Sequence, residues 1–142
     1  MRWVLLDEVL KIEKGKAAYT AGRIPSGDFG AEVLMIEMMA QTGALLLGAE
    51  SDYSRDLVFA KIQEAEFLEG YCSGDRVEIK AASENLHPEG AWINAEMTAG
   101  GRPVARANLM LMIVGHFTEG NEKPITFHEA FMNHYRVREK LS

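Results

Sequence analysis

Val33 to Leu47 reads VLMIEMMAQTGALLL, a continuous apolar segment with one acid, Glu37, near its middle. Apolar residues recur at three- and four-residue steps and also fill most of the remaining faces, which is typical of a buried helix. An unpaired carboxylate is costly to bury, so Glu37 must find a hydrogen-bonding partner, reach a cleft or take up a proton. Each of these outcomes suits a residue that transfers protons, and Glu37 is therefore the first candidate catalytic residue.

The flanking sequence predicts one long helix and an antiparallel meander. The helix is expected from about Ala31 to Ala49, after a loop that contains Pro25 and Gly30. Strands are expected at residues 17–23, 58–66, 76–82, 91–99 and 103–114, and residues 5–12 fit either a short helix or a strand. This order predicts an α+β fold in which a sheet wraps around the central helix. The apolar segment 109–114 predicts that a subunit interface covers the last strand.

Length and composition narrow the class of protein. A chain of 142 residues with 47% hydrophobic residues is expected to form one globular domain. Its net charge of −6 argues against nucleic acid as a partner, and no apolar run reaches the roughly 20 residues that cross a bilayer, so no membrane partner is expected. The single cysteine, Cys72, cannot form an internal disulfide, so a cytoplasmic location is expected. The four histidines lack ligand spacing, so neither a metal nor another cofactor is expected.

The character of the chain changes after the last predicted strand. Residues 115–124 are polar and rich in turn formers, whereas Phe127, Phe131, His134 and Val137 form a stripe at helical spacing. These observations predict a domain of residues 1–115 and a C-terminal extension of residues 116–142. The extension is expected to be helical and to dock on the domain or on a neighbouring chain.

Several segments resemble, in the same order, the hot-dog-fold 3-hydroxyacyl-acyl carrier protein dehydratases (FabA/FabZ-like). The resemblance runs from about Leu5 to Val114. Its most specific part is the central helix with Glu37-Met-Met-Ala-Gln41, and supporting parts are Leu5-Leu-Asp-Glu-Val9, residues 15–28, Lys61-Ile-Gln-Glu-Ala-Glu-Phe67 and Gly74-Asp-Arg-Val77. The resemblance implies a hot-dog fold, in which a long central helix is wrapped by an antiparallel sheet. No counterpart is recognised for the chain after His116.

The resemblance also implies a chemistry and partners. In the family, a histidine takes the α-proton of a 3-hydroxyacyl thioester, and an acid matched by Glu37 protonates the leaving hydroxyl. A backbone N–H at the start of the helix polarises the thioester carbonyl. The implied partners are thioesters of acyl carrier protein or coenzyme A and a second copy of the chain, as a homodimer or larger homo-oligomer, or a hetero-oligomer with a homologue. The implied substrate-binding residues are Arg23, Phe29, Gly30, Gln41 and Lys61.

The sequence departs from the family at the catalytic histidine. That residue belongs to a Gly-His-Phe-Pro-Gly turn before the helix, but no histidine precedes His87 in this chain. Counting back from Glu37 without a gap places Arg23 there, and a guanidinium cannot act as a base near neutral pH. In a second alignment the turn is missing, and Gly27-Asp28-Phe29-Gly30 crosses the gap. The candidate replacement bases are Asp28, or His87 or His116 from a second subunit.

Three functions follow from these observations and remain open at this point. The first is a dehydratase-like enzyme of fatty-acid or polyketide-like biosynthesis, with lost or altered activity. The second is an acyl thioesterase in which Glu37 activates water or attacks the thioester directly. The third is a non-catalytic protein that binds acyl chains or acyl carrier protein, or that completes the dimer of an active homologue.

Overall fold

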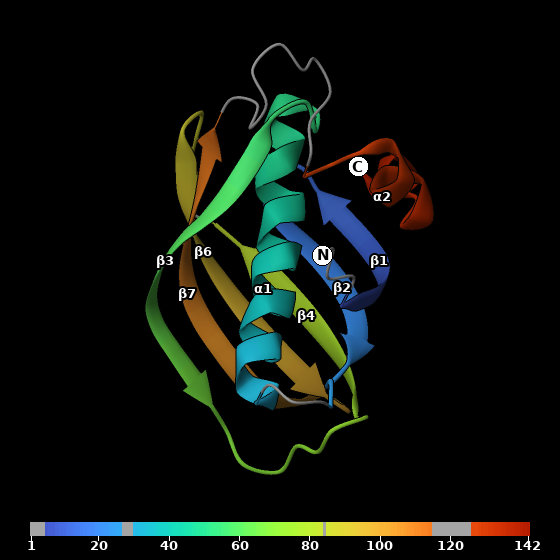
Figure 1. Cartoon of the computed structure of the whole chain (residues 1–142), viewed down its shortest axis with the longest axis vertical. Coiled ribbons are helices and arrows are strands. Elements are labelled where there is room, and N and C mark those ends of the chain that lie inside the picture. The colour runs from blue at the N-terminus through green and yellow to red at the C-terminus, as the bar shows by residue number, and fades with distance from the viewer. Residues whose placement is uncertain (1–4, 27–29, 84, 115–125) are drawn as a thin grey trace.

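A computed structural model describes residues 5–26, 30–83, 85–114 and 126–142. The long helix α1 spans Ala31–Gly48 and continues into one 3₁₀ turn, Ala49–Ser51. The strands are β1 (Leu6–Glu13), β2 (Ala17–Arg23), β3 (Asp56–Phe67), β4 (Arg76–Ala82), β5 (Leu86–His87), β6 (Gly90–Ala99) and β7 (Arg102–Val114). They form one antiparallel sheet in the order β1-β2-β4-β6-β7-β3, with β5 paired to β6 (Figure 1). The predicted α+β fold is confirmed.

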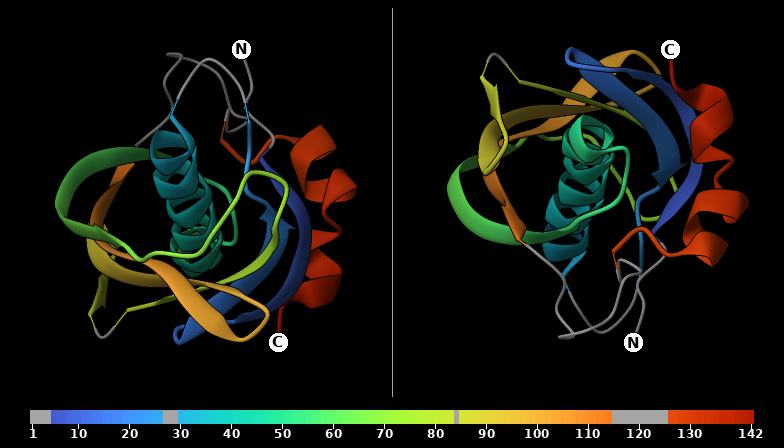
Figure 2. Two further views of the ribbon diagram at one scale, coloured as in Figure 1. Left: turned by 90° about the horizontal axis from the view of Figure 1, so that it is seen from below. Right: turned by 90° about the horizontal axis from the view of Figure 1, so that it is seen from above.

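The sheet curves around α1 and leaves one side of the helix without a strand (Figure 2). The helix approaches β6 and β7 closely at Gly43, where a Cβ atom would lie 3.0 Å from Ile93 Cγ2 and 3.1 Å from Leu111 Cδ1. The hydroxyls of Thr20 and Thr42, both fully buried, are 2.8 Å apart and join β2 to α1. An alanine at residue 43 would therefore fit only if Ile93 and Leu111 shifted by a few tenths of an ångström, and a larger side chain would need larger shifts.

Length and composition alone would allow the segment Ala31–Ser51 to cross a membrane. In the structure, 61% of its most apolar window is buried inside the domain. Burial of this kind is the property of a core helix, and the apolar character of the segment is explained by its contacts with the sheet.

The expected strands are present, and the structure decides the segment that the sequence left open. Residues 6–13 form a strand, β1, at one edge of the sheet. Leu86 and His87, which lie outside the expected strands, pair with Ala91 and Gly90 as the short strand β5. A two-residue strand has no alternating pattern that could have revealed it.

The C-terminal residues form two short helices, α2 (Glu129–His134) and α3 (Val137–Lys140), rather than one. Arg136 between them has a left-handed backbone, with φ of 53°. Three groups of this segment donate to the β1 edge: Tyr135 Oη to the Leu6 carbonyl at 2.7 Å, and Ser142 N and Oγ to the Ile12 carbonyl at 2.8 and 3.3 Å. The segment therefore covers the free edge of β1. The predicted boundary between domain and extension falls at residues 115–125, outside the described residues.

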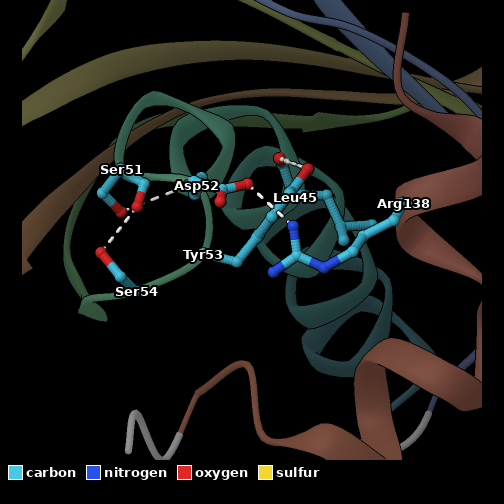
Figure 3. A network of polar contacts seen from close by, with 7 residues as sticks. Leu45, Ser51, Asp52, Tyr53, Ser54 and Arg138 are labelled. Carbon is cyan, nitrogen blue, oxygen red and sulfur yellow. Dashed lines mark hydrogen bonds and ion pairs between the residues drawn. The ribbon is translucent and has the colours of Figure 1, made fainter. Parts of the chain in front are cut away.

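The end of α1 is tied to the same segment (Figure 3). Tyr53 Oη donates to the Leu45 carbonyl at 3.0 Å, and Arg138 Nη1 donates to Asp52 Oδ1 at 2.8 Å. Phe127 packs edge-on against Tyr53 with ring centroids 5.0 Å apart. The last turn of the core helix and the C-terminal segment thus form one packed unit.

Raising the pH above about 10 is expected to destabilise the fold through its buried tyrosines. Burial raises the pKa of Tyr135 from 10.0 to about 12 and also raises the pKa of Tyr53. A raised phenol pKa means that the folded state keeps a proton that the unfolded state releases, so this stability is complete below pH 10 and is lost towards pH 12. Urea unfolding followed from pH 8 to 12 measures the loss, and Tyr135→Phe should make it shallower. An unchanged profile in Tyr135→Phe would contradict this assignment.

Candidate functional site

Glu37 lies half-buried in the second turn of α1 and has a partner on its own helix. Gln41 Nε2 donates to Glu37 Oε1 at 3.3 Å, a contact across one helical turn. The amide orients one carboxylate oxygen toward Gln41. Glu37 and Gln41, both predicted site residues, are therefore brought together as a polar pair on one face of the helix.

The face that carries this pair is the least buried part of α1. Its other members are Val33, which is 58% exposed, and the half-buried Ile36 and Ala44. On the opposite side, Met35, Met38 and Leu45 are fully buried. The sequence suggested a helix buried on all faces, but the structure covers only the faces toward the sheet. We call the residues Val33, Ile36, Glu37, Gln41 and Ala44 the open face.

Strand β3 carries exposed apolar side chains at the edge of the sheet. Phe59 and Ile62 are 38% and 44% exposed, although the register places them opposite Leu111 and Leu109, whose side chains are buried toward α1. Their side chains lie on the same concave face of the sheet as those leucines, but α1 leaves them partly exposed. The sequence predicted that a subunit interface covers the last strand. Strand β7 lies between β6 and β3, and Met112 on its outer face is 43% exposed, so that interface stays a prediction. The edge that needs cover is β3.

Other predicted site residues lie elsewhere. Gly30 is the N-cap of α1 and supplies no side-chain cap, so the first-turn N–H groups have no capping side chain. Arg23 ends β2, and its Nη1 donates to the Gly74 carbonyl at 3.0 Å. Lys61 pairs in register with Met110, whose neighbours Leu109 and Leu111 point toward the helix. Lys61 therefore lies on the outer face of the sheet, and the structure does not bring it to Glu37.

The candidate replacement bases are not seen beside Glu37. Asp28, Phe29 and His116 lie outside the described residues. His87 is exposed and lines a surface hollow with Glu50 and Arg55, at the C-terminal end of α1. Thirteen helical residues separate Glu37 from Glu50, which corresponds to about 20 Å. Within one chain, His87 is therefore remote from Glu37.

A polar pair at the start of α1 was not predicted. Tyr71 Oη donates to Glu32 Oε1 at 2.7 Å. This bond lowers the pKa of Glu32 and raises the pKa of Tyr71. The two residues are 39 positions apart, and no local pattern could have joined them. The pair marks the polar end of the open face.

Among the described residues, no group of histidine, cysteine, aspartate and glutamate side chains could hold a metal ion.

Comparison with known proteins places the chain in a family. The chain is 30% identical over 122 residues to the 3-hydroxyacyl-acyl carrier protein dehydratase FabZ of Latilactobacillus sakei, a match that covers 78% of this chain and 87% of the relative. The chain belongs to the FabZ family. A second FabZ, from Herpetosiphon aurantiacus, is 27% identical over 124 residues, a match that covers 79% of this chain and 88% of the relative. No family model matches the chain.

Solved structures share the fold of this FabZ-family chain at low identity. The dehydratase heterocomplex ApeI:P of Xenorhabdus doucetiae matches with a TM-score of 0.65 at 14% identity, covering 79% of this chain and 84% of the neighbour. A hypothetical thioesterase of Streptococcus pneumoniae, solved with coenzyme A, matches with a TM-score of 0.62 at 14% identity, covering 76% and 85%. The predicted hot-dog fold is confirmed, and the family links the chain to acyl-thioester chemistry.

Proposed function

We propose that this protein binds acyl thioesters on the open face of α1, with Glu37 as the group that transfers protons. The observation that carries the proposal is the Glu37–Gln41 pair, because it places an oriented carboxylate within an otherwise apolar, partly uncovered helix face. An acyl chain suits the apolar surface, and the carboxylate can serve the polar centre of the thioester. The expected carriers are acyl carrier protein and coenzyme A, and the cytoplasm is the expected location.

Dehydration on this site needs a second group. Elimination of water breaks the bond between C3 and its hydroxyl, forms the double bond between C2 and C3, and transfers the C2 proton to a base. Glu37 supplies a proton to the leaving hydroxyl, but the sequence holds no histidine before His87 to accept the C2 proton. Asp28 is the candidate closest in sequence to the start of the helix. We therefore propose a dehydratase-like protein with altered or lost activity.

Thioester hydrolysis is the second candidate, because it needs only the groups already paired here. Glu37 can take a proton from water while the water oxygen attacks the thioester carbonyl, after which the carbon–sulfur bond breaks and the thiol leaves with a proton. The alternative in which Glu37 itself attacks would form an anhydride that water then opens. Gln41 holds the carboxylate in position for either route.

A second chain is expected to complete the site across β3. The edge of β3 has no strand beside it within the described residues, and its Phe59 and Ile62 are exposed next to the concave face. Pairing with a second copy would join two sheets and bury these side chains. A homologous chain is the alternative partner, and the non-catalytic role of completing the dimer of an active homologue would then apply.

Ile62→Lys is expected to convert the dimer into monomers, because it places a charge in the middle of the apolar edge. Light scattering at micromolar concentration measures the mass. Lys61→Ala, on the outer face of the same strand, is the matched control and should leave the mass unchanged. A monomeric wild type, or a dimer that survives Ile62→Lys, would contradict assembly through β3.

Product analysis distinguishes the functions. The wild type is incubated with a 3-hydroxyacyl thioester on acyl carrier protein and on coenzyme A, and the enoyl thioester, free acid and unreacted substrate are measured. Enoyl product supports the dehydratase, free acid supports the thioesterase, and binding without turnover supports the non-catalytic role. Absence of both binding and turnover on either carrier would overturn the proposed function.

A further inference from the structure

We propose that Phe127, from the C-terminal segment, ends the path of the acyl chain along α1 and so limits the length of chain that the protein accepts. This inference rests on the proposed function. It adds a specificity-determining residue that lies outside the helix and the sheet. The position of Phe127 follows from its close approach to Gly48, at the end of α1.

The side of α1 that carries Glu37 continues toward the end of the helix through small residues. Glu37, Gln41, Ala44 and Gly48 follow one another at steps of four, three and four residues, so they lie on the same side of the helix. Ala40 lies beside them. Beyond the polar pair, the half-buried Ala44 and the buried Gly48 are small, and the fully buried Leu47 flanks them. An apolar chain can approach the helix closely over residues that lack large side chains.

This row ends at Gly48, where the rings of Phe127 and Tyr53 form a wall. Gly48 is buried, and a Cβ atom at this position would lie 2.6 Å from Phe127 Cζ and 2.9 Å from Tyr53 Cδ1. Phe127 and Tyr53 are 4% and 2% exposed, and they pack edge-on against each other. Tyr53 is held by its hydrogen bond to the Leu45 carbonyl, and the ring centroid of Phe131 lies 5.9 Å from that of Phe127. The two rings therefore block the row at Gly48.

The direction of the chain follows from the two ends of the row. The start of α1, where Gly30 supplies no side-chain cap and Tyr71 pairs with Glu32, is the polar end and suits the polar thioester. Toward the end of α1 the row is apolar. An acyl chain whose reacting carbon lies at Glu37 therefore extends toward Ala44 and Gly48, because this orientation avoids burying the polar head group.

Helix geometry converts the row into an expected chain length. Ala44 lies about 10 Å and Gly48 about 16 Å beyond Glu37 along the axis. An extended chain advances by roughly 1.2 Å per bond, as in an extended backbone. The wall then stops a straight chain about eight to thirteen bonds beyond the reacting carbon. Medium-length acyl chains should fit, and longer chains should meet the ring of Phe127.

The test uses one substitution that should lengthen the longest acyl chain accepted and one that should shorten it. Binding of a series of straight acyl thioesters of increasing length, on coenzyme A and on acyl carrier protein, is measured for the wild type and for each variant. Phe127→Leu should raise the affinity for the first chains beyond the wild-type limit by about tenfold, the value expected for two further buried methylene groups. Ala44→Leu should shorten the limit, because it fills the row.

Phe131→Leu is the matched control. It removes a ring from the same aromatic cluster, but the atoms nearest to Gly48 belong to Phe127 and Tyr53 and not to Phe131. It should leave the length limit unchanged. Melting temperature and mass confirm that each variant is folded and assembled as the wild type. An unchanged limit in both Phe127→Leu and Ala44→Leu, in a protein that binds acyl thioesters, would overturn the inference alone. Absence of binding at every length would overturn the proposed function with it.

Discussion

Ending the chain after residue 125 is expected to abolish cooperative folding. The deletion removes Phe127, Tyr135 and Val137, which are at most 4% exposed and belong to the main core. Burial of side chains of this size stabilises by about 1.5–3 kcal/mol each, so the loss is on the order of 6 kcal/mol. Native domains are stable by only about 5–15 kcal/mol, and the deletion also uncovers the β1 edge. Urea unfolding followed by circular dichroism measures the effect.

Arg138→Ala is the control for this deletion. Its ion pair with Asp52 is 2.8 Å long, but both side chains are more than half exposed. Exposed ion pairs contribute about 0–1 kcal/mol, so this variant should unfold almost as the wild type does. A truncated chain that unfolds cooperatively with the same midpoint would contradict this expectation and show that the core is complete without residues 126–142.

Glu37→Gln is expected to lower turnover by about a hundredfold or more, whichever thioester reaction the wild type performs. General acid–base assistance typically contributes about 10² to 10⁴ in rate, and an amide cannot supply it. The side chains have the same shape, and Gln41 can still donate to the amide oxygen, so the fold should be preserved. Initial rates at saturating substrate measure the effect. Glu50→Gln, near the far end of the same helix, is the matched control and should retain the wild-type rate.

The wild type itself is expected to dehydrate 3-hydroxyacyl thioesters slowly, about 10² to 10⁴ times below a FabZ relative that carries the histidine turn. The physical reason is the missing base, because no histidine precedes His87. Parallel assays of the two proteins on one substrate give the ratio. Equal rates would mean that another base is present. In that case a large loss in one of Asp28→Asn, His87→Ala and His116→Ala would identify it.

Local patterns in the sequence predicted the central elements of this fold. Strand β4 alternates Val77, Ile79 and Ala81 toward the core with charged residues outward, and the structure confirms this period. The long helix was evident because apolar residues recur through nearly five turns of α1. These elements were predictable because the pattern of buried and exposed positions repeats along the sequence with the period of a strand or a helix.

Features that depend on distant contacts were not predictable in this way. Apart from Glu37 and Gln41, the open face of α1 carries apolar residues like those of the covered faces, so only the curvature of the sheet distinguishes Ala44 from Leu45. Phe127 reaches Gly48 across 79 positions of sequence, and Tyr135 reaches Leu6 across 129. Glu37 was identified from its cost of burial, and its pairing with Gln41 is seen in the structure. Whether Glu37 works with Asp28 stays a prediction.

Methyl NMR of the protein during titration with an acyl thioester tests most directly whether the open face binds the acyl chain. Labels at isoleucine, alanine and methionine report on Ile36 and Ala44 on the open face, and on Met112, which is 43% exposed on the outer face of the sheet. We expect saturable shifts at Ile36 and Ala44, with Met112 unchanged. Shifts confined to Met112, or saturable binding with no shift at Ile36 and Ala44, would contradict a site at Glu37.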